Sequence, residues 1–287
     1  MSPAVTWERP SSRITRFTGC QRVQGDDLRE TDIWFSTATG KIVNSQEVFY
    51  DQQVAPDSVI DLGNRIVCPG FIDVQFNGAF GFDFSRPTTD IQSYIKSFRG
   101  LNRGLARTGV TSYLPTVTSS KPEVYHSVLP CLGPSGSIRV AEDGAESLGA
   151  HCEGPFISPT KNGIHSTDVL RSAPNGLKDL VDCYGQDSLS TNEHSSQQSP
   201  VKMITAAPEL EGILASIPAI VSGGTIFAIG HTEADFSTAS QAISAGATMI
   251  THLFNAMKPL HHRNPGVFGT LGQASNCLLY TSPSPRD

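Results

Sequence analysis

Several features that would direct a protein to a membrane, to nucleic acid or to secretion are missing from this sequence. No apolar run approaches the roughly 18 residues that a bilayer span requires, and the N-terminal stretch MSPAVTWERPSS lacks the charged-then-apolar order of a signal peptide. The formal net charge of -6 gives no electrostatic reason to expect nucleic acid. We therefore expect a cytoplasmic protein without a membrane or nucleic-acid partner.

Paired cysteines are missing as well. The six cysteines are scattered and form no C-x-x-C motif, so the sequence indicates neither a disulfide framework nor a zinc ribbon. We interpret them as mostly buried thiols without a ligand role. They are Cys20, Cys68, Cys131, Cys152, Cys183 and Cys277.

Two regions of the chain differ in pattern. Residues 12–66 alternate short β-like runs with Gly, Asp and Asn turns, which is typical of a small β domain. From Ile66 onward, apolar strands alternate with helical stretches such as 89–109 and 233–247, as a parallel barrel or a doubly wound sheet requires. We assign 1–65 to a small β domain, 66–272 to an α/β domain and 273–287 to an atypical, disordered tail.

Six apolar strands can be recognised in the second region, whereas a closed (β/α)₈ barrel needs eight. The fold class is therefore α/β, and the pattern alone leaves a barrel and an open sheet as alternatives. The predicted strands cover 66–76, 110–117, 147–156, 201–209, 225–231 and 247–255.

Polar side chains follow several of these strands. In parallel α/β barrels the chemistry lies at the carboxyl ends of the strands, and Glu153, His231 and His252 each lie at such an end. One carboxylate and two imidazoles suit Zn²⁺ or a similar divalent ion, with one position left open for water. Each histidine alone could instead be a hydrogen-bonded structural residue, but the three residues together predict a metal site.

The first strand ends in Gln75 and Asn77, where metal-dependent hydrolases often carry His-x-His. Gln75 could accept a hydrogen bond or weakly contact a metal ion, but a neutral amide is a poor substitute for imidazole. The Gln-x-Asn pair therefore predicts one metal ion rather than two.

Two loops offer groups that could bind a substrate. His165, in KNGIHS, is either a substrate contact or a solvated residue. Asn255, Ala256 and Arg263 lie in THLFNAMKPLHHRNPG, after the sixth strand. An arginine fork beside backbone N–H groups at a turn can bind an anion or a phosphate, and the alternative is a solvated basic loop.

Longer motifs run through the second region and cover residues from about 66 to 272. The Glu-Gly-Pro-Phe and His-Leu-Phe-Asn-Ala-Met pieces are much more specific than any lone histidine. The motifs are PGFIDVQFNGAFGFDF, HCEGPFISPTKNGIHS, APE, IGHTEADF and THLFNAMKPLHHRNPGVFG. This set resembles the N-acetylglucosamine-6-phosphate deacetylases of the amidohydrolase superfamily.

The resemblance implies an incomplete (β/α)₈ TIM-type barrel with a small N-terminal β domain. The implied reaction, part of amino-sugar catabolism, is hydrolysis of the acetamide of N-acetyl-D-glucosamine 6-phosphate to D-glucosamine 6-phosphate and acetate. By motif position, one divalent metal ion, with Zn²⁺ as our first choice, would be held by Glu153, His231 and His252. The sugar phosphate would be bound by Gln75, His165, Asn255, Ala256 and Arg263, in an enzyme that commonly forms a homodimer.

After Gly272 the sequence departs from the family pattern. The family uses an aspartate for proton transfer, in a Thr-Asp-Ala type motif at the end of the eighth strand, and these 287 residues contain no such motif. The resemblance therefore assigns no catalytic acid or base within them. An incomplete barrel also exposes sheet edges and apolar surface, so we expect a poorly stable chain with little deacetylase activity, which robust turnover would contradict.

Two alternatives stay open from the sequence. One is another amidohydrolase, which would act on a cyclic or aryl amide and would have no use for a phosphate clamp. The other is a non-catalytic truncated product that at most binds a metal ion or a partner.

Overall fold

The computed structural model describes residues 12–86, 90–136, 141–189, 199–271 and 278–279. Its chain forms two compact units, residues 1–69 and 70–287. The predicted tail, 273–287, lies outside the described residues except for Leu278 and Leu279, which form a short strand. Among the described residues, no helix has the length and apolar character that crossing a bilayer requires.

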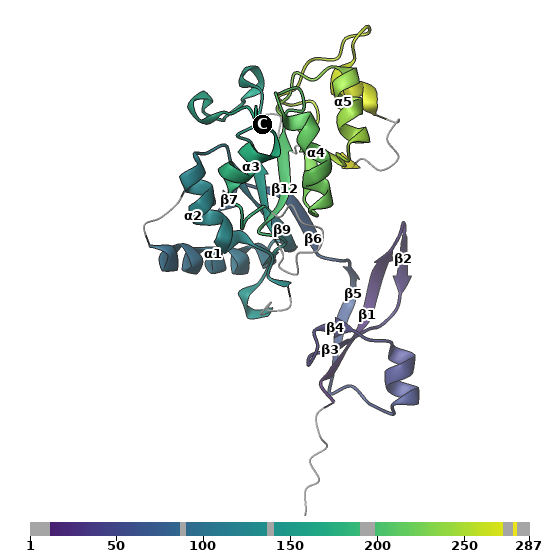
Figure 1. The fold of residues 1–287 in the computed structure, drawn as a ribbon. Coiled ribbons are helices and arrows are strands. Elements are labelled where there is room, and N and C mark those ends of the chain that lie inside the picture. Colours follow the sequence, from purple (N-terminus) through teal and green to yellow (C-terminus); the bar gives the residue numbers. More distant parts are fainter. Residues whose placement is uncertain (1–11, 87–89, 137–140, 190–198, 272–277, 280–287) are drawn as a thin grey trace, which may run out of the picture. The chain divides into compact units, whose positions relative to one another are not determined.

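The first unit is built on a five-stranded sheet, as predicted for a small β domain (Figure 1). Its central strand pairs with three others, and only the pairing of β1 with β5 is parallel. Ile14, Trp34 and Val48 form a small core. Val48 lies on a π-helical turn, Glu47–Asp51, that the sequence pattern did not predict. The strands are β1 (Ile14–Gln24), β2 (Asp27–Glu30), β3 (Ile33–Ser36), β4 (Lys41–Ile42) and β5 (Ser58–Val67).

A curved parallel sheet forms the centre of the second unit, which confirms the incomplete barrel. Its strand order is β6-β9-β11-β12-β13-β14-β15, and β10 also pairs with β9. Each of the six predicted strands contributes to this sheet. The strands are β6 (Phe71–Phe76), β9 (Val110–Thr118), β10 (Glu146–Ser147), β11 (Ala150–Glu153), β12 (Val201–Ala206), β13 (Ile226–Ile229), β14 (Met249–Ile250) and β15 (Leu278–Leu279).

Helices connect these strands and pack against the sheet, and α2, α3, α4 and α5 contact one another in chain order (Figure 1). Asp235 caps α5 by accepting a hydrogen bond from the Thr238 N–H at 2.8 Å, as expected for a carboxylate at this position. The helices are α1 (Ile91–Ala106), α2 (Pro122–Leu132), α3 (Leu177–Tyr184), α4 (Ile213–Ser222) and α5 (Phe236–Ser244).

Shorter elements complete the second unit. They are the hairpin of β7 (Gly78–Ala79) and β8 (Phe82–Asp83), and the 3₁₀ turns η3 (Ala141–Asp143), η4 (Pro159–Lys161), η5 (Thr167–Val169) and η6 (Gly266–Thr270). The turns η4 and η5 belong to the long loop that follows β11, and this loop carries His165.

Inward-facing residues of the parallel sheet form layers, because alternate residues of a strand point to the same face. An apolar layer comes first and consists of Leu114, Met203, Ala228 and Met249. Two residues further along the strands lies a polar layer, in which Thr205 Oγ1 is 2.7 Å from both His151 Nε2 and Thr251 Oγ1. The same period then places Glu153 above His151, at the carboxyl end of β11.

Candidate metal centre

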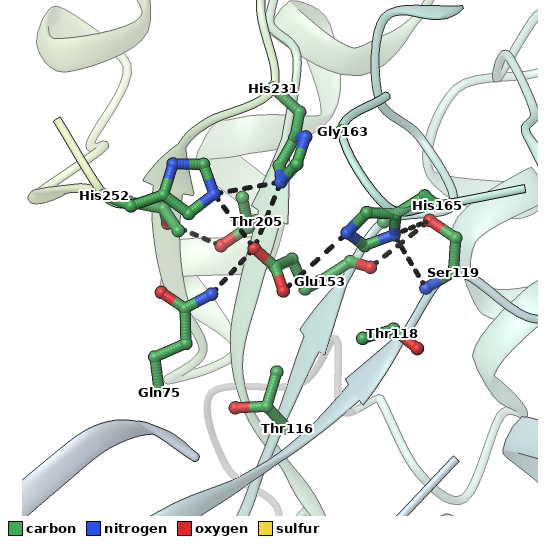
Figure 2. A network of polar contacts seen from close by, with 12 residues as sticks. Gln75, Thr116, Thr118, Ser119, Glu153, Gly163, His165, Thr205, His231 and His252 are labelled. Carbon is green, nitrogen blue, oxygen red and sulfur yellow. Dashed lines mark hydrogen bonds and ion pairs between the residues drawn. The ribbon is translucent and has the colours of Figure 1, made fainter. Parts of the chain in front are cut away.

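Glu153, His231 and His252 converge at the carboxyl ends of three parallel strands (Figure 2). Glu153 Oε1 is 3.2 Å from Nε2 of each histidine, and the two Nε2 atoms are 2.9 Å apart. Gln75, from β6, donates a hydrogen bond from Nε2 to the same Glu153 oxygen at 2.7 Å. Because Glu153, His231 and His252 are only 3–5% exposed, their polar atoms face one another rather than bulk water.

Local backbone geometry directs these side chains inward. His231 and His252 lie just after their strands with φ angles of 50° and 31°, which turn each chain sharply at the sheet edge. Gly154 follows Glu153 with φ of 76°, and a Cβ there would come within 2.1 Å of Ser119 Oγ. Only glycine therefore lets the loop after β9 approach the end of β11 this closely.

Hydrogen bonds at Nδ1 determine which nitrogen of His231 and His252 can bind a cation. His231 Nδ1 is 2.7 Å from the Lys161 carbonyl oxygen, and His252 Nδ1 is 3.2 Å from that of Asn255. A carbonyl oxygen only accepts, so each Nδ1 carries a proton, and in the neutral form of each ring Nε2 keeps its lone pair. Both lone pairs then face the Glu153 carboxylate, as expected of metal ligands that are oriented by a carbonyl behind them.

His165 has the opposite tautomer. Its Nδ1 accepts a hydrogen bond from the Ser119 N–H at 3.1 Å and lies 2.7 Å from Ser119 Oγ. Since a backbone N–H only donates, the proton of neutral His165 is on Nε2, which faces Glu153 Oε2 at 3.8 Å. By proximity alone, Glu153, His165 and His231 form a group whose ligand atoms lie within 4.8 Å, but this tautomer makes His165 a donor rather than a metal ligand.

The spacing of the three converging atoms fits a divalent cation. Donor atoms bound to a tetrahedral Zn²⁺ at about 2.0–2.2 Å lie roughly 3.3–3.6 Å apart, and the separations here are 2.9–3.2 Å. In addition, Gln75 Oε1 is buried and has no hydrogen-bond partner among the described residues. Two lone pairs, a carboxylate and an orphaned amide oxygen together form a site that favours positive charge.

Charge and burial shift the pKa values of this cluster in opposite directions. Burial raises the pKa of the Glu153 carboxyl, but the hydrogen bonds with the His231 and His252 side chains outweigh it and hold the pKa well below 4.5. Burial lowers the pKa of His252, but the neighbouring Glu153 carboxylate raises it above 6.5 overall. Without a cation, the carboxylate therefore favours a proton on His252, and a metal ion would replace that proton.

His165 stays neutral at pH 7 because burial lowers its pKa to about 4. A neutral imidazole with its proton on Nε2 is a hydrogen-bond donor toward the site and not a source of protons. This geometry suits a group that holds an acceptor oxygen of a bound molecule.

The loop after β14 carries the residues expected to bind phosphate. Asn255 donates from its backbone N–H to the His252 carbonyl oxygen at 2.9 Å. This hydrogen bond closes the turn that begins at His252. Ala256 has φ of 48°, in the left-handed region that can form an anion-binding turn. Arg263 lies further along the same loop with an exposed side chain.

Sequence reasoning missed several residues that shape this centre. Ser119 and Lys161 fix the tautomers of His165 and His231 through backbone groups, and no sequence signal marks such a role. His151 could have been found, because it lies two residues before Glu153 on the same strand and must share its face. Burial lowers the pKa of His151 to about 4, so this histidine is a neutral part of the polar layer.

A parallel half-barrel with a carboxylate and two imidazoles at the carboxyl ends of its strands defines an amidohydrolase-type centre. No family model matches the sequence. However, N-acetylglucosamine-6-phosphate deacetylase of Danio rerio is 40% identical over 262 residues, which make up 90% of this chain and 59% of that protein. The human deacetylase is 39% identical over 94% of this chain and 62% of its own length.

Solved structures agree with these relatives. The N-acetylglucosamine-6-phosphate deacetylase of Pasteurella multocida matches with a TM-score of 0.70 and 26% identity, over 93% of this chain and 63% of that one. The chain is therefore a homologue of the N-acetylglucosamine-6-phosphate deacetylases, which confirms the prediction from its motifs. It spans about 60% of the length of the curated relatives that it matches.

Proposed function

We propose that this chain forms the metal-binding and substrate-binding part of an enzyme that hydrolyses the acetamide of N-acetyl-D-glucosamine 6-phosphate. The observation that carries the proposal is the convergence of Glu153 Oε1, His231 Nε2 and His252 Nε2, all within 3.2 Å of one another. A variant deacetylase of Mycobacterium smegmatis, solved with N-acetyl-D-glucosamine 6-phosphate, is 26% identical with a TM-score of 0.67. That similarity supports the same substrate here.

Glu153, His231 and His252 would hold one divalent ion, with Zn²⁺ as the first choice for an oxygen and two nitrogens. When bound, such an ion would supply Lewis-acid polarisation of the amide carbonyl and a lowered pKa for a water molecule. Gln75 orients the Glu153 carboxylate through its 2.7 Å hydrogen bond. The other groups would bind and orient the substrate.

His165 would donate its Nε2–H to the acetyl oxygen of the substrate, because Ser119 keeps the proton on that nitrogen. Since the ring is buried and neutral at pH 7, it can donate this hydrogen bond without adding a charge. Such a donor stabilises the negative charge that develops on the oxygen during attack on an amide.

Asn255, Ala256 and Arg263 would hold the 6-phosphate, through the amide group, the backbone N–H and the guanidinium respectively. Their loop begins at His252, so the phosphate and the metal ion would lie at two ends of one turn. We assign no described residue to the proton transfers. The homodimer and the cytoplasmic location stay predictions.

Metal binding tests the first part of the proposal. Co²⁺, a spectroscopic substitute for Zn²⁺, is titrated into the chain and into His231→Ala and His252→Ala, with visible absorption as the readout. We expect one equivalent to bind, and each substitution to weaken binding at least a hundredfold. His126→Ala is the matched control, because His126 is an exposed helical residue outside the site. Binding that neither site substitution alters would refute the metal centre.

Substrate binding tests the second part. Calorimetry of the Co²⁺-loaded chain compares N-acetylglucosamine 6-phosphate with N-acetylglucosamine. Because a charge-assisted hydrogen bond contributes about 1.5–3 kcal/mol, Arg263→Gln should weaken the phosphorylated sugar roughly 10- to 100-fold. Arg107→Gln, at an exposed arginine after α1, is the control. Equal affinity for both sugars would instead favour an amidohydrolase without a phosphate clamp.

A further inference from the structure

Glu209 is a carboxylate near the centre that neither the metal site nor the substrate contacts use. It follows β12 within the APE motif. Its Oε2 accepts a hydrogen bond from Thr232 Oγ1 at 2.5 Å, and its Oε1 accepts one from the Glu233 N–H at 2.6 Å. Both donors belong to the turn that begins at His231, so Glu209 holds this turn from the neighbouring strand.

Thr232 connects that turn with the loop after β14. Its N–H donates to the Ala256 carbonyl oxygen at 3.1 Å, and its carbonyl oxygen accepts from the Lys258 N–H at 3.1 Å. These two bonds form a parallel bridge between Thr232 and Met257. Thr232 is fully buried, and its hydroxyl donates to Glu209 and accepts a hydrogen bond from the Ala234 N–H at 2.9 Å.

A second set of contacts leads from Glu209 back to the His231 ring. The N–H of Glu233 donates to Glu209, and the Glu233 carboxylate forms an ion pair with Lys161 Nζ at 3.1 Å. The Lys161 carbonyl oxygen is the acceptor for His231 Nδ1. Glu209 thus holds the backbone of Glu233, and the Glu233 side chain pairs with Lys161. The carbonyl oxygen of Lys161 in turn keeps the lone pair of His231 on Nε2.

Backbone strain explains why such support is needed. His231 and Ala256 both have φ angles in the left-handed region, at 50° and 48°. A non-glycine residue in that region costs on the order of 1–3 kcal/mol and persists only where surrounding contacts impose it. The carboxylate of Glu209 and the bridge through Thr232 together impose the left-handed conformation on His231 and on Ala256.

We propose that Glu209 is a positioning residue that holds the His231 turn and the 256–258 segment as one unit, so that cation binding and phosphate binding depend on the same clamp. This inference rests on the proposed function for the roles of His231 and of the phosphate loop. Glu209 acts through Thr232 and Glu233, without contact to the cation or the sugar.

Co²⁺ titration and calorimetry with N-acetylglucosamine 6-phosphate test the clamp in the 287-residue chain. Contacts behind a metal ligand typically change metal affinity 10- to 100-fold, so Glu209→Ala should weaken Co²⁺ binding by that factor and alter the visible spectrum of bound Co²⁺. The Co²⁺-loaded variant should also bind the sugar phosphate about tenfold more weakly. Glu211→Ala, at an exposed glutamate two residues away, should stay within twofold for both ligands.

Thr232 provides a second, milder test in case Glu209→Ala does not fold. Thr232→Val keeps the shape and the backbone bridge but removes the hydroxyl, and should weaken Co²⁺ binding about tenfold. Thr232→Ser keeps the hydroxyl and should restore binding to within about twofold of the unaltered chain. Urea unfolding of each variant separates a change at the site from a general loss of stability.

Three results would overturn the inference. Glu209→Ala could match Glu211→Ala in both affinities, or Thr232→Val and Thr232→Ser could behave alike. Either result, with Co²⁺ binding still dependent on His231, would refute the proposed role of Glu209 while leaving the proposed metal centre supported. Co²⁺ binding that is independent of His231 would instead overturn the proposed function and the clamp together.

Discussion

A second carboxylate beside Glu153 gives a quantitative test of the centre. Gln75 Nε2 is 2.7 Å from Glu153 Oε1, so Gln75→Glu replaces a donor with a like charge at nearly the same place. At an effective dielectric constant of about 20, two such charges repel by roughly 6 kcal/mol. The new carboxyl can escape this cost by taking up a proton, which for an ordinary pKa of about 4.3 costs roughly 3.7 kcal/mol at pH 7.

The cost of protonation therefore sets the upper limit of the destabilisation caused by Gln75→Glu. Because position 75 is partly exposed, solvent screening reduces the repulsion between the two carboxylates further. We expect Gln75→Glu to lower the free energy of unfolding of the metal-free chain by about 2–4 kcal/mol at pH 7. The pKa of the new carboxyl is raised in the folded state. Its destabilising effect is therefore absent below the unfolded pKa of about 4.3 and grows as pH rises toward the folded pKa. At pH 5 the loss should be at most about 1 kcal/mol.

A divalent cation should reverse much of this effect, because it would lie between the two carboxylates. Urea unfolding at pH 5 and pH 7, with a chelator or with excess Co²⁺, measures each case. Gln75→Met is the uncharged control of similar shape. The reasoning is refuted if Gln75→Glu and Gln75→Met unfold with equal free energies at pH 7 in the chelator, or if Co²⁺ stabilises both by the same amount.

Three further outcomes can be checked with the same assays. His165→Gln should leave Co²⁺ affinity within about threefold of the unaltered chain while it weakens binding of the sugar phosphate about tenfold or more. If His165 were instead a metal ligand, the substitution would weaken Co²⁺ binding. Because the pKa of His252 is raised, protons should compete with Co²⁺, so that affinity measured by titration falls as pH drops through that pKa; a flat profile from pH 8 to 5 would contradict this. Asp235→Ala should lower the free energy of unfolding by about 1 kcal/mol, since it removes the α5 cap on Thr238, and Asp235→Ser should retain most of it. Since that hydrogen bond lowers the pKa of Asp235, the difference between Asp235→Ala and the unaltered chain should shrink as pH falls through the folded pKa of this carboxyl, and a constant difference would count against the cap.

Strand-end residues were predictable because a parallel sheet brings them to one edge. Glu153, His231 and His252 could be selected from the sequence, since each follows an apolar strand and their side-chain chemistry suits one ion. The curved parallel sheet was predictable for the same reason, from alternating apolar strands and helical stretches. The π-helical turn at Glu47–Asp51 carries no comparable periodic signal and was missed.

Contacts through the backbone were beyond the reach of the sequence. Ser119 and Lys161 determine the tautomers of His165 and His231 with an N–H and a carbonyl that every such residue has. Their identity therefore says nothing about the role, and only the three-dimensional path of the loops reveals it. For this reason the sequence could suggest His165 as a substrate contact but could not determine which of its nitrogens carries the proton.

The turns at the centre are strained, and this strain links stability to function. His231, His252, Phe254 and Ala256 all have positive φ angles, each at a cost of order 1–3 kcal/mol. Hydrogen bonds from neighbouring loops offset part of this cost, as at Thr232 N–H and Ala256 O. A cation bound by His231 and His252 would offset more, because it gains free energy only when both turns are formed. Metal binding and formation of the proposed phosphate-binding turn at Ala256 should therefore be one coupled equilibrium, with each ligand stabilising the turn that the other requires.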